Sequence, residues 1–138
     1  MGFDQYHEPA NELSAETRTF ARMCANLTEE AEAIGWYEQR ISLETDEESR
    51  SVMLDSLGEE YKHFSMDLEF LLRRKPQWRQ IAQGILFTSG DIAGHGEAAE
   101  AAANGEDSEQ ETGGAADVSL GIGGLKGAVT NSSKGQGL

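Results

Sequence analysis

Apolar residues recur at every seventh position through the first third of this chain. The repeating residues are Phe20, Leu27, Ile34 and Ile41, flanked by Met23, Cys24, Ala31 and Tyr37. Seven residues make almost two turns of an α-helix, so the pattern predicts one amphipathic helix of roughly 28 residues. Ser14 followed by Glu16 is typical of a helix start, and we expect the helix to end near Leu43.

A second apolar stripe follows after a short interval. Its members are Met53, Leu57, Phe64, Leu68 and Leu71. Thr45 with Glu48 three residues later forms a capping-box pattern, so only a short turn separates two helices that then run antiparallel. The second helix is expected to finish in the cations of 73–75, and Pro76 to begin a short helix that ends near Gly84. The predicted fold is all-α: a two-helix antiparallel hairpin plus a short C-terminal helix.

The composition changes beyond Phe87. Residues 89–117 hold eight acids and no Lys or Arg, which predicts an acidic disordered linker with at most a transient helix. Residues 118–127 form an apolar island in which glycines separate Leu120, Ile122 and Leu125. Such an island is typical of a docking peptide or of a chance apolar patch. The expected organisation is an extended segment at 1–13, a helical domain at 14–88, the linker, the island, and a tail at 128–138.

Charge, length and cysteine content argue against several classes of protein. The 138 residues carry a formal charge of -14, so nucleic acid is not expected as a partner. The opening residues lack the pattern of a signal peptide, and no stretch has the roughly 18–20 apolar residues of a membrane span. The single cysteine, Cys24, lies among apolar positions and fits a core role in a reducing compartment. We expect one small cytoplasmic domain without membrane contact.

Three ionisable residues interrupt the two apolar stripes. A helical wheel places Glu30 in the middle of the first stripe, Glu60 in the middle of the second, and His63 beside Glu60. Buried carboxylates cost several kcal/mol unless a cation neutralises them, and neither apolar face carries Lys or Arg. A metal ion is the natural remaining cation. Alternatively, these residues lie at a solvated edge and pair with Arg or Lys of a neighbour. Glu59, four residues before His63, could also face it, but the helical wheel favours Glu60 as the ligand.

The ligand types narrow both the metal and the assembly. Carboxylates with one imidazole and no thiolate favour iron or manganese, with zinc as a further candidate. A ferritin-like di-iron bundle uses a Glu from each of two helices and a Glu-x-x-His motif from each of the other two. This chain has one of each, in Glu30 and Glu60-x-x-His63, and a two-helix hairpin is too thin to bury its own stripes. We therefore expect a two-fold homodimer that forms a four-helix bundle around the site.

The flank of the first helix next to this site carries Glu29, Glu32 and Trp36. Two carboxylates beside an aromatic ring are suited to attracting cations and passing them inward. An ordinary solvated acidic flank has the same composition, and the helical wheel leaves both interpretations open.

The sequence resembles the encapsulated ferritins, the ferritin-like cargo proteins of bacterial and archaeal encapsulin compartments. The resemblance rests on motifs spread over residues 7–90: His7-Glu8-Pro9, TEEAEAIGWYEQR at 28–40, EEYKH at 59–63, MDLEFLLRR at 66–74 and ILFTSG at 85–90. The island motif SLGIGGLKG at 119–127 also resembles the encapsulin-targeting peptide of such cargo, although here the tail at 128–138 follows it.

The resemblance implies a function and a role for each matched residue. Glu30, Glu60 and His63 would ligate iron at a dimer-interface ferroxidase centre, with Tyr37 close by and Glu29, Glu32 and Trp36 as a metal-entry site. The family assembles into a ring of five dimers, a decamer, and leaves iron storage to the encapsulin shell. Residues 118–127, through Leu120, Ile122 and Leu125, would dock to the shell protein, which places the chain in the lumen of a cytoplasmic compartment. Manganese, zinc or calcium are alternative occupants in isolated protein.

Two other functions remain compatible with the residues. One is a metal buffer or structural helical adaptor without turnover. The other is a di-manganese protein that handles peroxide or superoxide. A ferroxidase differs from both because it oxidises many Fe(II) ions at each site.

Overall fold

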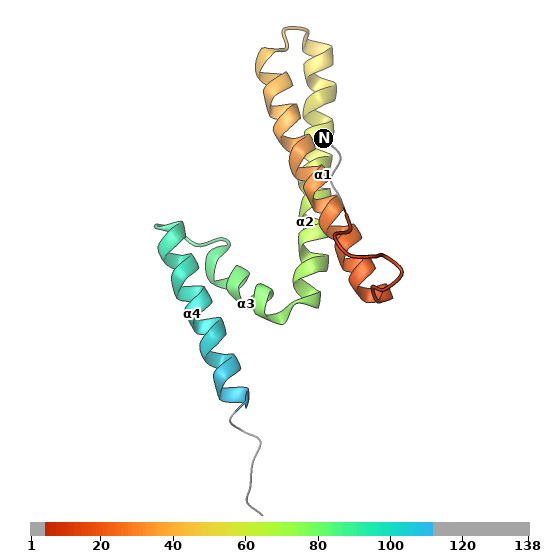
Figure 1. Ribbon diagram of the computed structural model, residues 1–138. Coiled ribbons are helices and arrows are strands. Elements are labelled where there is room, and N and C mark those ends of the chain that lie inside the picture. Colours follow the sequence, from red (N-terminus) through yellow and green to blue (C-terminus); the bar gives the residue numbers. More distant parts are fainter. Residues whose placement is uncertain (1–4, 112–138) are drawn as a thin grey trace, which may run out of the picture.

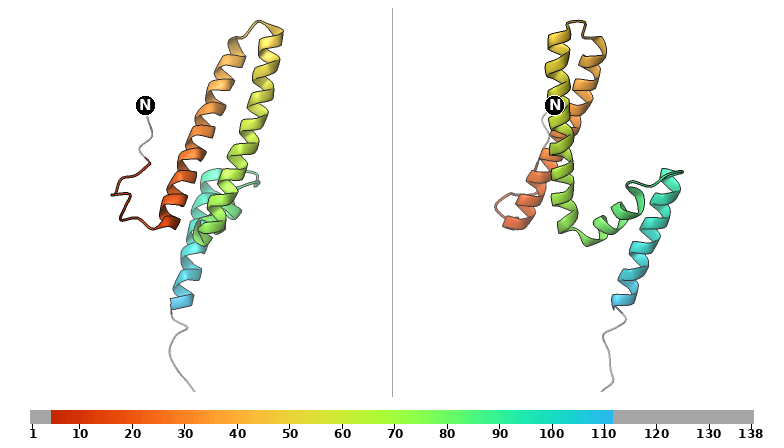
Figure 2. Two further views of the ribbon diagram at one scale, coloured as in Figure 1. Left: turned by 90° about the vertical axis from the view of Figure 1, so that its right-hand side faces the viewer. Right: turned by 180° about the vertical axis from the view of Figure 1, so that it is seen from behind.

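The computed structural model describes residues 5–111, which form four helices and no strand (Figure 1). The helices are α1 at Ala15–Leu43, α2 at Glu47–Arg74, α3 at Pro76–Ile85 and α4 at Ile92–Glu111. Helices α1 and α2 form a long antiparallel hairpin, as predicted (Figure 2). The predicted island at 118–127 and the tail at 128–138 lie outside the described residues.

Side-chain caps fix the starts of both helices of the hairpin. The hydroxyl of Ser14 accepts a hydrogen bond from the backbone N–H of Thr17 at 3.1 Å, so α1 begins where the sequence predicts. At the start of α2 the prediction of Thr45 as the cap is wrong. Asp46 is the N-cap, and its carboxylate accepts a hydrogen bond from the backbone N–H of Ser49 at 2.7 Å. A carboxylate is favoured at this position because it also interacts with the positive end of the helix dipole.

The turn itself is braced by Glu44. Its carboxylate accepts hydrogen bonds from the backbone N–H of Asp46 at 2.9 Å and from the Ser49 hydroxyl at 2.8 Å. These donors hold the pKa of Glu44 below its usual value, with the Asp46 backbone contributing most. The bracing keeps the two helices in one register along the hairpin.

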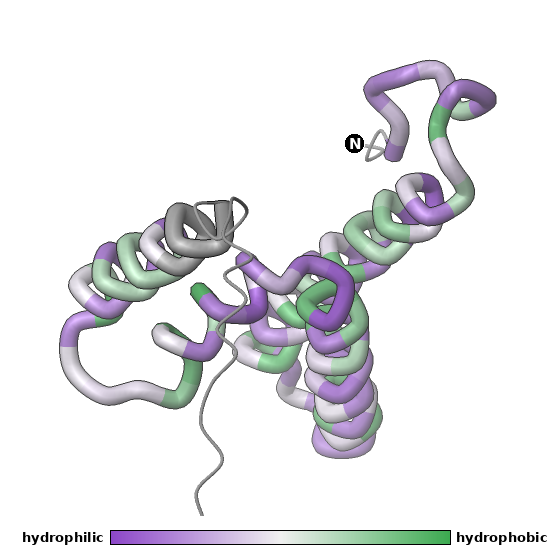
Figure 3. The backbone as a smooth tube through the Cα atoms, turned by 90° about the horizontal axis from the view of Figure 1, so that it is seen from below, coloured by the Kyte–Doolittle hydropathy of each residue, from purple (hydrophilic) through white to green (hydrophobic). Residues whose placement is uncertain are grey.

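The hairpin has a thin core. Only a few of its side chains are buried, namely Ala25, Ile41, Leu57, Leu71 and Leu72. Several large apolar side chains stay exposed, including those of Trp36, Leu43, Val52, Tyr61 and Met66. Figure 3 shows hydrophilic and hydrophobic residues intermixed along the helices. Because two helices cannot enclose each other's apolar faces, this hairpin presents apolar surface that a further helical layer would cover.

The last two helices form a second, smaller pair that points away from the hairpin (Figures 1 and 2). Pro76 begins α3 as predicted, and the carboxylate of Glu69 on α2 accepts a hydrogen bond from the Arg79 guanidinium of α3 at 3.0 Å. The elbow between α3 and α4 contains two residues with positive φ, Phe87 at 61° and Gly90 at 93°.

Helix α4 corrects the expectation of disorder for residues 89–117. Residues 92–111 are helical, and Ala99 and Ala103 are buried in the pairing of α4 with α3. A Cβ atom added to Gly84 would lie 2.6 Å from the Cβ of Ala99, so α3 and α4 approach closely there. The sequence pattern concealed this helix because alanines, rather than large apolar residues, make the contact. The amide of Gln77 also donates a hydrogen bond to the Asn104 side chain at 3.0 Å.

Within residues 5–111, none of the helices combines the length and apolar character that crossing a membrane requires.

Candidate metal centre

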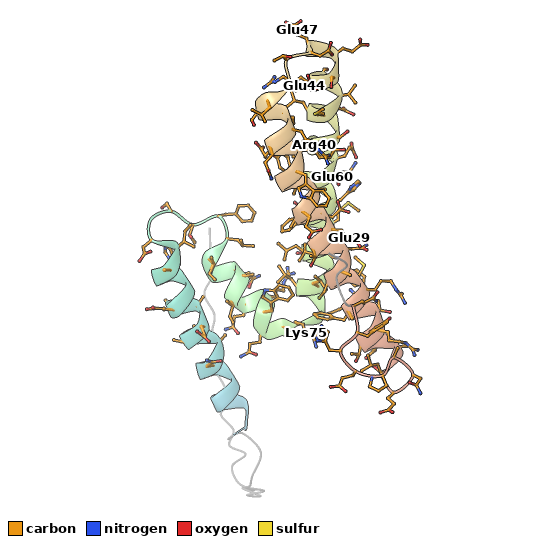
Figure 4. The ribbon with its side chains drawn as sticks, turned by 45° about the horizontal axis from the view of Figure 1, so that its top comes forward. Glu29, Arg40, Glu44, Glu47, Glu60 and Lys75 are labelled. Carbon is orange, nitrogen blue, oxygen red and sulfur yellow. The ribbon has the colours of Figure 1, made fainter. Side chains whose placement is uncertain are left out.

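Glu30, Glu60 and His63 come together half-way along the hairpin. Glu30 lies near the middle of α1, and Glu60 and His63 lie on α2, one turn apart. Figure 4 labels Glu60 well away from the hairpin tip, where Glu44 and Glu47 lie. One ligand atom from each of the three side chains lies within 4.8 Å of the other two, and they form a group of the size and type that holds a metal ion. The helical wheel placed the three residues on facing stripes and the structure brings them together, while their role as ligands stays a prediction.

The distances show which imidazole nitrogen faces the carboxylates. His63 Nδ1 lies 3.3 Å from Glu60 Oε2 and 3.9 Å from Glu30 Oε2. An i, i+3 pair on a helix brings its side chains to one face, which explains the first contact. The antiparallel pairing of α1 with α2 supplies the second.

The cluster is partly enclosed and open on one side. The side chains of Glu30 and Glu60 are 23% and 20% exposed, and that of His63 is 44% exposed. Within residues 5–111, neither glutamate forms an ion pair with Lys or Arg. The alternative of a solvated edge paired with a basic residue is therefore not realised inside the described chain.

The two glutamates shift each other's pKa in opposite directions. The hydrogen bond to Glu60 and then burial raise the pKa of Glu30 to about 7, and the negative charge of Glu60 adds to the effect. The same hydrogen bond from Glu30 lowers the pKa of Glu60, as does the contact with His63. Two carboxylates this close cannot both ionise cheaply without a cation between them. The pair thus has the electrostatic character of a cation site that a proton fills when no metal is bound.

The donor set fits a hard or borderline divalent ion. Carboxylate oxygens and one imidazole nitrogen suit iron, manganese or zinc, whereas no thiolate is present in the cluster to favour a softer ion. Three donors do not complete the coordination of any of these ions. The remaining positions would be filled by water or by groups from a second chain.

Glu59 is separated from the other two glutamates. Its Oε2 forms an ion pair with the Lys62 ammonium and lies 3.9 Å from His63 Nε2, on the other side of the ring from Glu30 and Glu60. The Lys62 contact lowers the pKa of Glu59. Glu60, rather than Glu59, is therefore the carboxylate that shares the cluster with Glu30.

Asp67 is a neighbour of the cluster that sequence reasoning missed. It is half-buried on α2, one turn after His63, and burial raises its pKa, while His63 opposes the shift. Its negative charge also contributes to the raised pKa of Glu30 across the helix pair. The signal was available, because Asp67 follows Glu60 by seven residues and lies within about 20° of it on a helical wheel.

The predicted entry site and Tyr37 are less tightly organised. Glu29, Glu32 and Trp36 are exposed on α1, with Trp36 at 52%, and they are not part of the three-ligand group. The Arg40 guanidinium lies 5.6 Å from the centre of the Tyr37 ring and 6.0 Å from that of Trp36. The roles of these four residues stay predictions.

Residues 5–89 match the family whose description is EncFtn-like. The chain belongs to this family. It is 42% identical over 89 residues to a "Ferritin-like protein" of Thermotoga maritima, covering 64% of this chain and 78% of that protein. It is 39% identical over 123 residues to an "Encapsulated ferritin-like protein" of Rhodospirillum rubrum, covering 88% and 87% of the two chains. The resemblance inferred from the sequence motifs is thereby confirmed.

The fold comparison agrees with the sequence comparison. A crystal structure of a protein from Nitrosomonas europaea superposes with a TM-score of 0.63 at 38% identity and covers 65% of this chain and 99% of that one. The Rhodospirillum rubrum alignment, at 123 residues, is longer than residues 1–111 and therefore includes part of the sequence at 112–138. The similarity to this relative thus continues beyond the residues that the structure describes.

Proposed function

We propose that this chain is a ferroxidase that oxidises Fe(II) to Fe(III) at a di-iron centre formed across a dimer interface. The observation that carries the proposal is the group formed by Glu30, Glu60 and His63, in which one ligand atom from each side chain lies within 4.8 Å of the other two. Membership of the EncFtn-like family and the similarity to proteins named as ferritin-like support iron as the substrate.

The dimer follows from the shape and ligand count of the hairpin. One chain supplies two carboxylates and one imidazole, which is half of the ligand set of a ferritin-like di-iron bundle. The cluster is open on one side, and large apolar side chains are exposed on the same two helices. A second hairpin related by a two-fold axis would cover this surface and complete the ligand set. Association of such dimers into a decameric ring is part of the proposal.

The reaction uses two Fe(II) ions as substrate and oxygen as the oxidant. Each ion gives up one electron, and one O₂ takes two electrons and two protons to become H₂O₂, leaving two Fe(III). The carboxylates of Glu30 and Glu60 favour this direction because hard, anionic oxygen donors bind Fe(III) more strongly than Fe(II). Binding of iron displaces the proton that Glu30 retains through its raised pKa, so Glu30 is the group that releases it.

The product is expected to leave the protein. We propose that an encapsulin shell encloses the chain and stores the ferric iron, as the family resemblance implies. The predicted docking peptide at 118–127, with Leu120, Ile122 and Leu125, would anchor the chain to the lumenal face of that shell. The name of the Rhodospirillum rubrum relative and the length of its alignment support this role. Glu29, Glu32 and Trp36 would pass iron to the centre.

Iron oxidation by purified full-length protein tests the proposal. Fe(II) is added in successive portions with oxygen present, and ferric absorbance and oxygen uptake are recorded for the wild type, E60A, H63A and the control D55N. Asp55 is an exposed acid on the same helix. We expect many turnovers per site in the wild type and D55N, and loss of most oxidation in E60A and H63A with helix content retained.

Other outcomes identify the competing functions. Iron uptake that stops at about one ion per chain, the number that one set of Glu30, Glu60 and His63 would hold, indicates a metal buffer or structural adaptor. Manganese in the isolated protein, with weak iron oxidation, indicates a peroxide- or superoxide-handling protein. Unchanged oxygen consumption in E60A and H63A would refute the assignment of the centre.

A further inference from the structure

The two nitrogens of the His63 ring face different carboxylates. Nδ1 lies toward Glu60 and Glu30, at 3.3 and 3.9 Å, and Nε2 lies 3.9 Å from Glu59 Oε2. The ring therefore lies between two carboxylates of the proposed centre, Glu30 and Glu60, and the carboxylate of Glu59, which is not part of that centre.

This arrangement bears on which nitrogen carries the ring proton. A neutral imidazole has one N–H donor and one bare nitrogen, and only the bare nitrogen binds a metal ion. When Nδ1 is the ligand, Nε2 must hold the proton, and it then needs an acceptor. An ionised carboxylate is purely an acceptor, so a carboxylate beside Nε2 favours the tautomer with Nδ1 bare and competes for the ring proton with Glu60, which lies 3.3 Å from Nδ1.

Glu59 is placed and restrained for this task. It precedes His63 by four residues, a spacing that brings both side chains to one face of α2. The Lys62 ammonium binds Oε2 of Glu59, the same oxygen that faces Nε2. The glutamate side chain is 54% exposed, so it can rotate from its 3.9 Å position into hydrogen-bond distance without disturbing the packing.

No other described group is placed to do this. Glu30 and Glu60 face the Nδ1 side of the ring. Asp67 influences His63 electrostatically, but within residues 5–111 it makes no hydrogen bond or ion pair with the ring. Glu59 is thus the described carboxylate that lies at Nε2.

We propose that Glu59 is the positioning residue of the centre: its carboxylate accepts the Nε2–H of His63 and so directs the bare Nδ1 at the cation between Glu30 and Glu60. The inference rests on the proposed function, since it assigns a role within the same centre. Carboxylates that hold a ligating histidine in this way typically contribute about 10- to 100-fold to metal affinity.

The test measures tautomer and metal affinity without any oxidation step. Full-length protein labelled with ¹⁵N in its three histidines gives the ring nitrogen shifts in the metal-free state, and Zn²⁺ affinity is measured by chelator competition. The variants are E59A, E59Q and the control D55N, which removes an exposed charge four residues earlier on α2. In E59Q the amide oxygen can still accept the Nε2–H.

In the metal-free state we expect the Nε2–H tautomer to be more populated in the wild type than in E59A, where only the carboxylates on the Nδ1 side attract the ring proton. We also expect at least about tenfold weaker Zn²⁺ binding in E59A, largely restored in E59Q. An unchanged tautomer and affinity in E59A would overturn the proposal. So would equal weakening in E59Q or in D55N, because charge alone would then explain the effect. Wild-type protein that does not oxidise iron contradicts the proposed function, whereas the tautomer of E59A decides this inference separately.

Discussion

The raised pKa of Glu30 makes the stability of the metal-free protein depend on pH in a predictable direction. The pKa of Glu30 is raised from 4.5 to about 7, so between these values the folded chain binds more protons than the unfolded chain. Stability must then fall as the pH rises through this range and level off above it. The full shift corresponds to at most about 3 kcal/mol. Partial exposure and the opposite shift of Glu60 reduce the expected loss to about 1–2 kcal/mol.

Glu30→Gln removes the group responsible. A neutral amide can still donate a hydrogen bond to Glu60, so no charge repulsion develops when the pH rises. Relative to the wild type, we expect the metal-free variant to be about 1–2 kcal/mol more stable at pH 8 and about equally stable at pH 4. Urea unfolding followed by circular dichroism, on chelator-treated protein at one fixed concentration, measures this difference.

The control is Glu32→Gln, an exposed glutamate on the same helix, which should keep the pH dependence of the wild type. Adding Zn²⁺ at pH 8 should stabilise the wild type more than Glu30→Gln, because the variant lacks one ligand. A wild-type stability that stays flat from pH 4.5 to pH 8 would refute the argument. An equally steep decline in Glu30→Gln would refute it as well.

Three further predictions concern Asp67, the α3–α4 pair and the turn. Asp67→Asn should lower the pKa of Glu30 and so narrow the pH range over which the stability of the metal-free protein declines, as measured by urea unfolding at several pH values. An unchanged range would contradict the effect of the Asp67 charge on Glu30. Gly84→Ala should destabilise the protein by about 1–3 kcal/mol in thermal or urea unfolding, because the added Cβ would meet that of Ala99. Gly35→Ala has open space around it and should stabilise the protein by about 0.5–1 kcal/mol. Equal effects at both sites would argue against the close α3–α4 contact. Asp46→Ala removes the N-cap of α2 and should lower the free energy of unfolding by about 0.5–2 kcal/mol in the same urea unfolding, whereas Thr45→Ala should lower it much less. A larger loss in Thr45→Ala than in Asp46→Ala would identify Thr45 as the cap.

Much of the hairpin was predictable from the sequence because each signal was local and strong. The seven-residue recurrence ending at Ile41 fixes the length and inner face of α1, and Ser14 fixes its start. The cap of α2 was misassigned by one residue, since Thr45 and Asp46 are both good caps and the hydrogen bonds of Glu44 decide between them. The sequence pattern does not show which of these two adjacent caps the local hydrogen bonds select.

Helix α4 and the neighbours of the centre were harder to predict. Ala99 and Ala103 give almost no hydropathy signal, and their burial depends on a glycine, Gly84, in a different helix. Asp67 lies on the face that the helical wheel marked, so its place near the centre could be predicted, but its effect on the pKa of Glu30 could not. Its relation to Glu30 exists only because α1 and α2 pair in this register.

By itself, the sequence determined that two amphipathic helices carry Glu30, Glu60 and His63 on their inner faces, because helical periodicity is a property of residue spacing. Only the tertiary structure decided that these side chains meet at one level of the hairpin. It also decided that the two carboxylates shift each other's pKa in opposite directions and that Nδ1 of His63 faces them while Nε2 faces Glu59. The physical reason is that a proton or metal ion responds to distances of a few ångströms, and the register of two packed helices sets those distances.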